Sequence, residues 1–227
     1  MSHLLIDADD TLWENNVYFE DAFDDFVAFL GHSSLTHGQI RDVLNEIELA
    51  NSKIHGYGSI NFGRNLRQLY EHLAERHIHE DDLARVMRFA ERILERPIEL
   101  IEGVEDTLGQ LSSRHDLTLF TKGNPEEQRL KVERSGLARY FRYTAIVKEK
   151  DPSAYRLLVE RRALPAADTW MIGNSPKSDI NPALEAGLGA VLVPHARTWV
   201  LELQDLRAPE GSRFRQVERF SDLTALF

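Results

Sequence analysis

The sequence contains no cysteine among its 227 residues. Disulfides, thiolate metal sites and cysteine nucleophiles are therefore excluded. No apolar run approaches the roughly 20 residues that cross a bilayer, so we expect no membrane partner. A secretory signal is not expected either, because an apolar strand is predicted from residue 3 onward. These features together predict a cytoplasmic protein.

Positive charge is also scarce. Lys and Arg number 27 against 37 Asp and Glu, which gives a formal net charge of −10. Proteins that bind nucleic acids usually carry a basic stripe, so we expect no nucleic-acid partner. An acidic surface does not exclude a phosphorylated substrate, because a local lysine and a metal ion can attract it.

Hydrophobic periodicity divides the chain into two parts. After a first short strand, the residues up to Pro97 have helical spacing and predict four amphipathic helices joined by short loops, which is typical of a small bundle. Beyond Pro97, predicted strands alternate with helices, as in a parallel sheet covered on both faces. The predicted fold class is therefore α/β, with a Rossmann-like core of residues 1–14 and 98–227 and an inserted helical domain of residues 15–97. In this prediction the first strand has no crossover helix of its own.

Polar residues follow four of the predicted strands. Ligands of open α/β sheets bind beyond the carboxyl ends of the strands, where these residues would gather. Each group alone has an ordinary explanation as a turn, a helix cap or a solvated face, but all four at one edge favour a binding site. The groups are Asp7 with Asp9, Thr121-Lys122-Gly123-Asn124, Lys148 with Lys150, and Gly173-Asn174-Ser175 with Asp179.

Asp7 and Asp9 are the carboxylates that most suggest chemistry. In a strand, residues i and i+2 project to the same face, so the two side chains are expected to point together. Close carboxylates repel each other unless a cation or a shared proton relieves them. We therefore expect a Mg²⁺ site or a pair with divided acid and nucleophile roles. The alternative is a strand followed by an Asp-rich turn, in which Asp10 and Thr11 take part.

The order of these motifs resembles the haloacid dehalogenase-like superfamily of phosphohydrolases over essentially the whole chain, and the helical insert looks like the cap type called C1. The resemblance implies that Asp7 is the nucleophile, forming an aspartyl-phosphate, and that Asp9 is the acid and base. It also implies a lysine that neutralises the negative charge of the nucleophile and the phosphate. The residues that contact the phosphate are implied to follow the second predicted strand. The implied phosphate-binding residues are Thr121, Lys122, Gly123 and Lys148, and the implied Mg²⁺ ligands are Asp7, the Asp9 carbonyl, Asn174 and Asp179.

Three positions depart from the family pattern or leave a choice within it. Asn174 stands where a carboxylate is usual in the family, so Asp179 is the only acidic residue of the group that follows the fourth of these strands. The affinity for Mg²⁺ is then either lower than is usual in the family or restored by Asp179. Lys150 is followed by Asp-Pro, which matches the family's Lys-x-Pro, so Lys150 is favoured over Lys148 as the active-site lysine. Lys122 occupies a position where many members carry Asn.

The activity that the resemblance implies is a Mg²⁺-dependent phosphatase acting on a small phosphorylated metabolite. Asp9 argues against the dehalogenases, which lack this second Asp because a halide leaves without a proton. A phosphomutase or phosphonate-type enzyme using the same site stays open, as does a catalytically weak regulatory or binding protein. The substrate and the oligomeric state, monomer or homodimer, do not follow from the sequence.

Substrate choice is predicted to reside in the helical domain, chiefly in a loop of residues 51–64 with Lys53, Tyr57 and Arg64 as candidate contacts. An ordinary surface loop is the alternative. We expect alanine at Tyr57 or Arg64 to lower kcat/KM for the best natural substrate at least tenfold, about 1.4 kcal/mol. A small aryl phosphate should be barely affected, because it fills little of the pocket. Parallel kinetics on both substrates test this, and equal losses would place specificity elsewhere.

Overall fold

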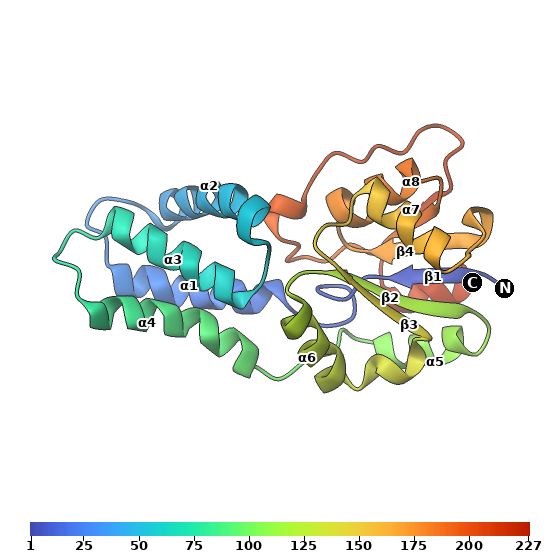
Figure 1. Cartoon of the computed structure of the whole chain (residues 1–227), viewed down its shortest axis with the longest axis horizontal. Helices are drawn as coiled ribbons and strands as arrows, with labels where there is room; N and C mark the ends of the chain where they lie inside the picture. The colour runs from blue at the N-terminus through green and yellow to red at the C-terminus, as the bar shows by residue number, and fades with distance from the viewer. The chain divides into compact units, whose positions relative to one another are not determined.

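The computed structural model describes residues 1–227 and contains one six-stranded sheet (Figure 1). Its strand order is β3-β2-β1-β4-β5-β6, and every pairing is parallel. The predicted α/β class with a parallel sheet is therefore confirmed. The strands are β1 (His3–Ile6), β2 (Asp116–Lys122), β3 (Tyr143–Val147), β4 (Thr169–Gly173), β5 (Gly189–Leu192) and β6 (Phe214–Gln216).

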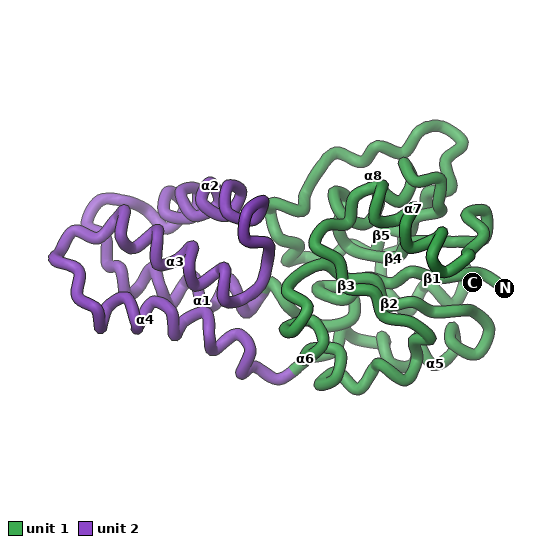
Figure 2. The backbone as a smooth tube through the Cα atoms, viewed as in Figure 1, with its two compact units in different colours: residues 1–16, 98–227 green, residues 17–97 purple.

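The chain divides into two compact units (Figure 2). Unit 1 contains the sheet and consists of Met1–Asn16 with Ile98–Phe227, whereas unit 2 is the helical segment Val17–Pro97. Unit 2 therefore interrupts unit 1 in the connection that leaves β1.

In unit 1, side chains alternate between the two faces of the sheet. Leu4 and Ile6 of β1 belong to one buried cluster, and Leu5 between them belongs to another. The first cluster packs against α5 (Val104–Ser112) and α6 (Pro125–Ser135). The second packs against α7 (Pro152–Arg161) and α8 (Asn181–Glu185). Both faces of the sheet are covered, which leaves the carboxyl ends of the strands as the edge where polar groups gather.

Two parts of unit 1 differ from the prediction. Helix α5 lies between unit 2 and β2, so the expectation that β1 has no crossover helix is wrong. Val104, Leu108 and Leu111 on this helix do have helical spacing, but the segment is only nine residues long. The segment after β4, where the alternating pattern predicts an ordinary helix, begins as a π-helical turn (Pro176–Ile180) that continues into α8.

Unit 2 consists of four helices whose core is rich in aromatic side chains. Phe23, Phe26 and Tyr70 are fully buried, and the rings of Phe26 and Tyr70 meet edge to face with centroids 6.5 Å apart. No helix in the structure combines the length and the apolar character that crossing a membrane requires. The helices are α1 (Asn16–Leu30), α2 (His37–His55), α3 (Ser59–Leu73) and α4 (Glu80–Glu91), the last continuing into a 3-10 turn (Arg92–Glu95).

The loop predicted over residues 51–64 is wrong in extent, because only Gly56–Gly58 separates α2 from α3. Gly63 lies inside α3, where an added Cβ would be 3.0 Å from the Ala90 Cβ on α4, so this glycine allows close helix packing. The three candidate substrate contacts therefore lie on different elements. Lys53 is exposed on α2, Tyr57 is half-buried in the turn, and Arg64 is exposed on α3.

Candidate active site

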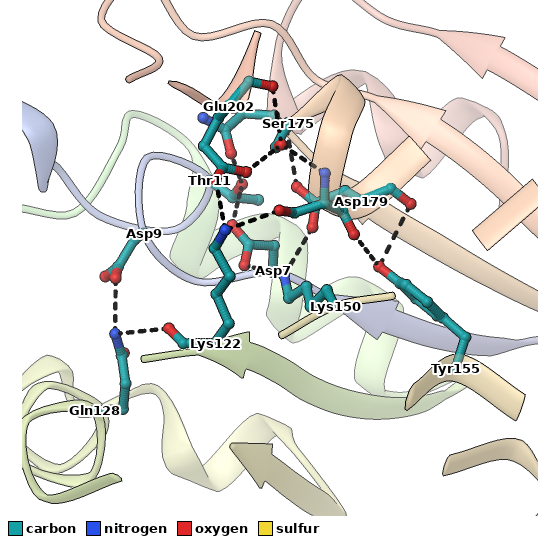
Figure 3. A network of polar contacts seen from close by, with 12 residues as sticks. Asp7, Asp9, Thr11, Lys122, Gln128, Lys150, Tyr155, Ser175, Asp179 and Glu202 are labelled. Carbon is teal, nitrogen blue, oxygen red and sulfur yellow. Dashed lines mark hydrogen bonds and ion pairs between the residues drawn. The ribbon is translucent and has the colours of Figure 1, made fainter. Parts of the chain in front are cut away.

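Two carboxylates and a lysine meet where the central strands end (Figure 3). Asp7 directly follows β1, and its backbone N–H donates to the Ile172 carbonyl of β4 at 2.9 Å. Asp179 lies on the π-helical turn after β4. The Lys150 ammonium donates to Asp7 Oδ1 and, at 2.7 Å, to Asp179 Oδ1. All three side chains are buried, so this group is shielded from bulk water.

Two negative charges share one positive charge in this group. Burial, and then the neighbouring Asp179, raises the pKa of Asp7 to about 7. Burial alone would lower the pKa of Lys150, but Asp179 and Asp7 outweigh it and raise that pKa, which keeps the ammonium charged. When both acids are ionised, the single ammonium of Lys150 leaves one negative charge of this group uncompensated.

Thr11 and Asn174 add further oxygen atoms beside Asp7. The Thr11 hydroxyl lies 3.1 Å from Asp7 Oδ2 and 3.3 Å from Asn174 Oδ1. The Asn174 amide N–H donates to the Thr198 hydroxyl at 3.0 Å, which turns the amide oxygen toward Thr11. Carboxylate and amide oxygens are the hard ligands that Mg²⁺ prefers, and the uncompensated negative charge favours a cation here. The residues present therefore fit the expected ion.

Gly173 is required by the close approach of Asp179. A Cβ on Gly173 would lie 2.2 Å from Asp179 Oδ2, so any larger residue would displace the carboxylate. The Ser175 backbone N–H donates to the same oxygen at 2.9 Å. The Tyr155 hydroxyl donates to the Ser178 carbonyl at 2.8 Å and fixes the turn that carries Asp179. The end of β4 and α7 thus hold this carboxylate in place.

Asp9 has different surroundings from Asp7, and the expectation that the two side chains point together is wrong. Strand β1 ends at Ile6, so the alternation of a strand does not apply to either residue. Figure 3 shows Asp9 turned away from Asp7 toward Gln128, whose amide donates to it at 2.8 Å. Trp13 Nε1 donates at 2.8 Å, and the Lys131 ammonium lies 2.6 and 2.7 Å from the two oxygens.

These partners keep Asp9 ionised. Burial acts to raise the pKa of Asp9, but the Lys131 ammonium and the hydrogen bonds outweigh it and hold that pKa below its usual value. The sequence reasoning missed Gln128 and Lys131. The available signal was their spacing, because residues i and i+3 of a helix share a face, and α6 follows the polar end of β2.

The residues predicted to bind phosphate do not all lie in the network. Thr121 is buried at the end of β2. Gly123 has φ of +141°, and its N–H donates to the Val147 carbonyl at 3.0 Å, so the chain turns sharply here. Lys122 donates to Ser178 at 2.9 Å and pairs with Glu202 instead of projecting freely. Lys148 is exposed, and no hydrogen bond or ion pair joins it to the network around Lys150.

Comparison with known proteins agrees with these features. A sequence model of the haloacid dehalogenase-like hydrolases matches residues 1–187. A haloacid dehalogenase-like family hydrolase from Xanthomonas campestris is 31% identical, with a TM-score of 0.86 over 100% of this chain and 90% of that chain. This chain belongs to the haloacid dehalogenase-like hydrolases. The family predicted from the motifs is thereby confirmed.

More distant structures share the fold of this haloacid dehalogenase-like hydrolase. A HAD-hydrolase of Bacillus subtilis, YfnB, described as bound to magnesium, has 18% identity and a TM-score of 0.68, covering 99% of this chain and 97% of that one. A Thermotoga maritima protein classed provisionally as a β-phosphoglucomutase has 21% identity and a TM-score of 0.69, covering 100% and 98%. Haloacid dehalogenases also match, for example one from Pseudomonas syringae at 22% identity. A search of the curated proteins found no match.

A second group of side chains that could bind a metal ion lies close to Asp7 and Asp9 in the sequence or in space. Oxygen or nitrogen atoms of Asp10, Glu14 and His195 lie within 4.8 Å of one another. The Asp10 carboxylate already accepts the backbone N–H groups of Asn15 and Asn16 at 2.9 and 3.0 Å. Asp10 has a φ of +59°, and burial raises its pKa to about 6. Its observed role is to hold the turn that leads from β1 to α1.

Glu202 joins three parts of this hydrolase that are distant in sequence. One carboxylate oxygen pairs with Lys122 of β2, and the other accepts the Ser175 hydroxyl at 2.6 Å. Burial acts to raise the pKa of Glu202, but Lys122 outweighs it and lowers that pKa. Sequence reasoning missed Glu202, because it is 80 positions from Lys122 and carries no motif.

We expect Glu202→Gln to lower the free energy of unfolding at pH 7 by roughly 3 kcal/mol, because the largely buried Lys122 ammonium would lose the negative charge of Glu202. The folded pKa of Glu202 lies below the ordinary 4.5. Its stabilisation is therefore complete above about pH 4.5 and is lost as the pH falls through the folded pKa. Urea unfolding of both proteins at several pH values should show the difference narrowing at acid pH. A difference independent of pH would contradict this assignment.

Proposed function

We propose that this hydrolase is a Mg²⁺-dependent phosphatase that cleaves a small phosphate monoester through an aspartyl-phosphate on Asp7. The observation that carries this proposal is the presence of two carboxylates in separate surroundings, Asp7 beside Lys150 and Asp9 beside Lys131. A nucleophile alone suffices to displace a halide, which leaves as an anion. A second carboxylate is needed when the leaving group is an alkoxide that takes up a proton.

In the proposed reaction, an oxygen of Asp7 attacks phosphorus while the bond from phosphorus to the ester oxygen breaks. Asp9 gives its proton to the departing alkoxide and then accepts a proton from the water that cleaves the aspartyl-phosphate. Lys150 stabilises the charge that gathers on Asp7 and the phosphoryl oxygens, and the Thr121 hydroxyl binds one of these oxygens.

The ion has a defined place in this proposal. Asp7, Asn174, Asp179 and the backbone carbonyl of Asp9 would hold Mg²⁺, which supplies positive charge to the phosphoryl group when bound. The raised pKa of Asp7 supports this, because a nucleophilic carboxylate must be ionised and a nearby cation favours that form. The magnesium described for the YfnB structure is a further support.

The helical unit is assigned the choice of substrate. In this proposal residues 17–97 form the cap domain, and Lys53, Tyr57 and Arg64 are its recognition residues. Their positions support a recognition role, because Lys53 and Arg64 are exposed on consecutive helices and Tyr57 lies in the turn between these helices. The partner is a small phosphorylated metabolite.

Hydrolysis of phenyl phosphate with and without Mg²⁺ tests the proposal directly. Phosphate release should require the ion, and Asp7→Asn should reduce it at least a thousandfold, about 4 kcal/mol, because an amide is a poor nucleophile. Retention of more than a few per cent of Mg²⁺-dependent activity would exclude the covalent mechanism. Halide release from a 2-haloacid would instead assign the dehalogenase reaction, and transfer between sugar hydroxyls a mutase.

Asp9→Asn should have an effect that depends on the leaving group. A phenolate leaves readily without a proton, whereas an alkoxide does not, so we expect a loss for ethyl phosphate at least tenfold greater than for 4-nitrophenyl phosphate. Rates for a series of esters with graded leaving-group pKa values give the measurement. The same loss for all esters would remove Asp9 from the general-acid role.

A further inference from the structure

Lys131 is a charged residue that the proposed mechanism does not use. Its ammonium lies 2.6 and 2.7 Å from the oxygens of Asp9 and 3.1 Å from Asn15 Oδ1. Its side chain is 14% exposed, so the charge is largely removed from water yet reachable by a ligand. Lys131 therefore lies next to the group that would protonate the leaving alcohol.

Both oxygens of Asp9 are already engaged in the free protein. Trp13, Gln128 and Lys131 together donate to them. An oxygen of Asp9 that reaches a leaving group must therefore give up some of these bonds. Trp13 and Gln128 are neutral, so only Lys131 would lose a counter-charge.

The other lysines of the site keep their acidic partners during the proposed reaction. Lys150 retains Asp179, and Lys122 retains Glu202. Lys131 retains only the neutral amide oxygen of Asn15. A largely buried ammonium without a counter-charge is unfavourable, so a complex in which a new anion takes the place of Asp9 is favoured.

We propose that Lys131 is a specificity-determining residue, which pairs with Asp9 in the free protein and with a second anionic group of the substrate in the complex. This inference rests on the proposed function and deepens it by naming a substrate class. Two consecutive hydrogen bonds through Asp9 place the ammonium within about 5 to 6 Å of the ester oxygen. The substrate class is therefore phosphate monoesters whose alcohol carries an anion, such as a carboxylate, on a carbon close to that oxygen.

The test compares phosphoglycolate with ethyl phosphate, because the two differ by a carboxylate in place of a methyl group. In the Mg²⁺-loaded full chain, we expect kcat/KM to favour phosphoglycolate at least about tenfold. Lys131→Met should abolish this preference, mainly by raising KM for phosphoglycolate, so that phosphoglycolate and ethyl phosphate are hydrolysed with similar kcat/KM. Lys131→Arg should retain part of the preference, since it keeps the charge.

Arg129→Met is the matched control, because Arg129 is exposed on the same helix and its replacement removes the same charge. It should leave the preference unchanged, and thermal unfolding should show that all variants fold. A wild-type protein without the preference, or a Lys131→Met variant that keeps it, overturns the inference. A parallel loss on both esters also overturns it and makes Lys131 a support for Asp9 alone.

The outcomes separate this inference from the proposed function. If no phosphate ester is hydrolysed in Mg²⁺, the phosphatase assignment fails and the inference fails with it. If phenyl phosphate is hydrolysed with the expected dependence on Asp7 but the preference for phosphoglycolate is missing, only the role of Lys131 is rejected.

Discussion

The ammonium of Lys150 between two buried carboxylates is the interaction on which the site depends. Asp7 and Asp179 follow neighbouring strands, but Lys150 follows β3, which is separated from β1 by β2. The lysine side chain crosses that distance over the ring of Phe120 on β2, whose centroid lies 5.5 Å from its nitrogen. The sheet order and the length of a lysine are therefore both needed to bring the three charges together.

The two aspartates of the first motif have pKa shifts opposite to those their proposed roles require. A nucleophile acts as a carboxylate, yet the pKa of Asp7 is raised to about 7, and an acid must carry a proton, yet the pKa of Asp9 is lowered. A cation beside Asp7 would lower the first pKa, and withdrawal of Lys131 from Asp9 would raise the second. In the proposed reaction, these two changes would give each aspartate the charge that its role requires.

The positions of site residues were predicted best where they depend on residues adjacent in the sequence. The strand ends located Asp7, Thr121 and Asp179 at one edge of the sheet. The match to the family's Lys-x-Pro favoured Lys150 over Lys148, and Lys150 is the lysine that contacts Asp179. The sheet was predictable for the same reason, since strands and helices alternate in the chain.

Partners fixed by tertiary packing could not be predicted in this way. Lys131 and Glu202 become recognisable only when the fold sets them against Asp9 and Lys122. The relation of Asp7 to Asp9 was mispredicted because β1 ends at Ile6, before either aspartate, so strand alternation does not apply to them. Gly63 was mistaken for a loop residue because close helix packing and a turn both select glycine.

The negative charge of Asp7 and Asp179 explains why a neutral residue at position 174 is favourable for folding. Asp7 and Asp179 together exceed the single charge of Lys150, and a third carboxylate at position 174 would increase that excess in a buried place. The amide keeps an oxygen near Asp7, through Thr11, without adding charge. The neutral side chain therefore limits the repulsion within this buried group, although it supplies one charged oxygen fewer. The hydrogen bond from Asn174 to Thr198 is the compensating contact, because an aspartate at this position could not donate it.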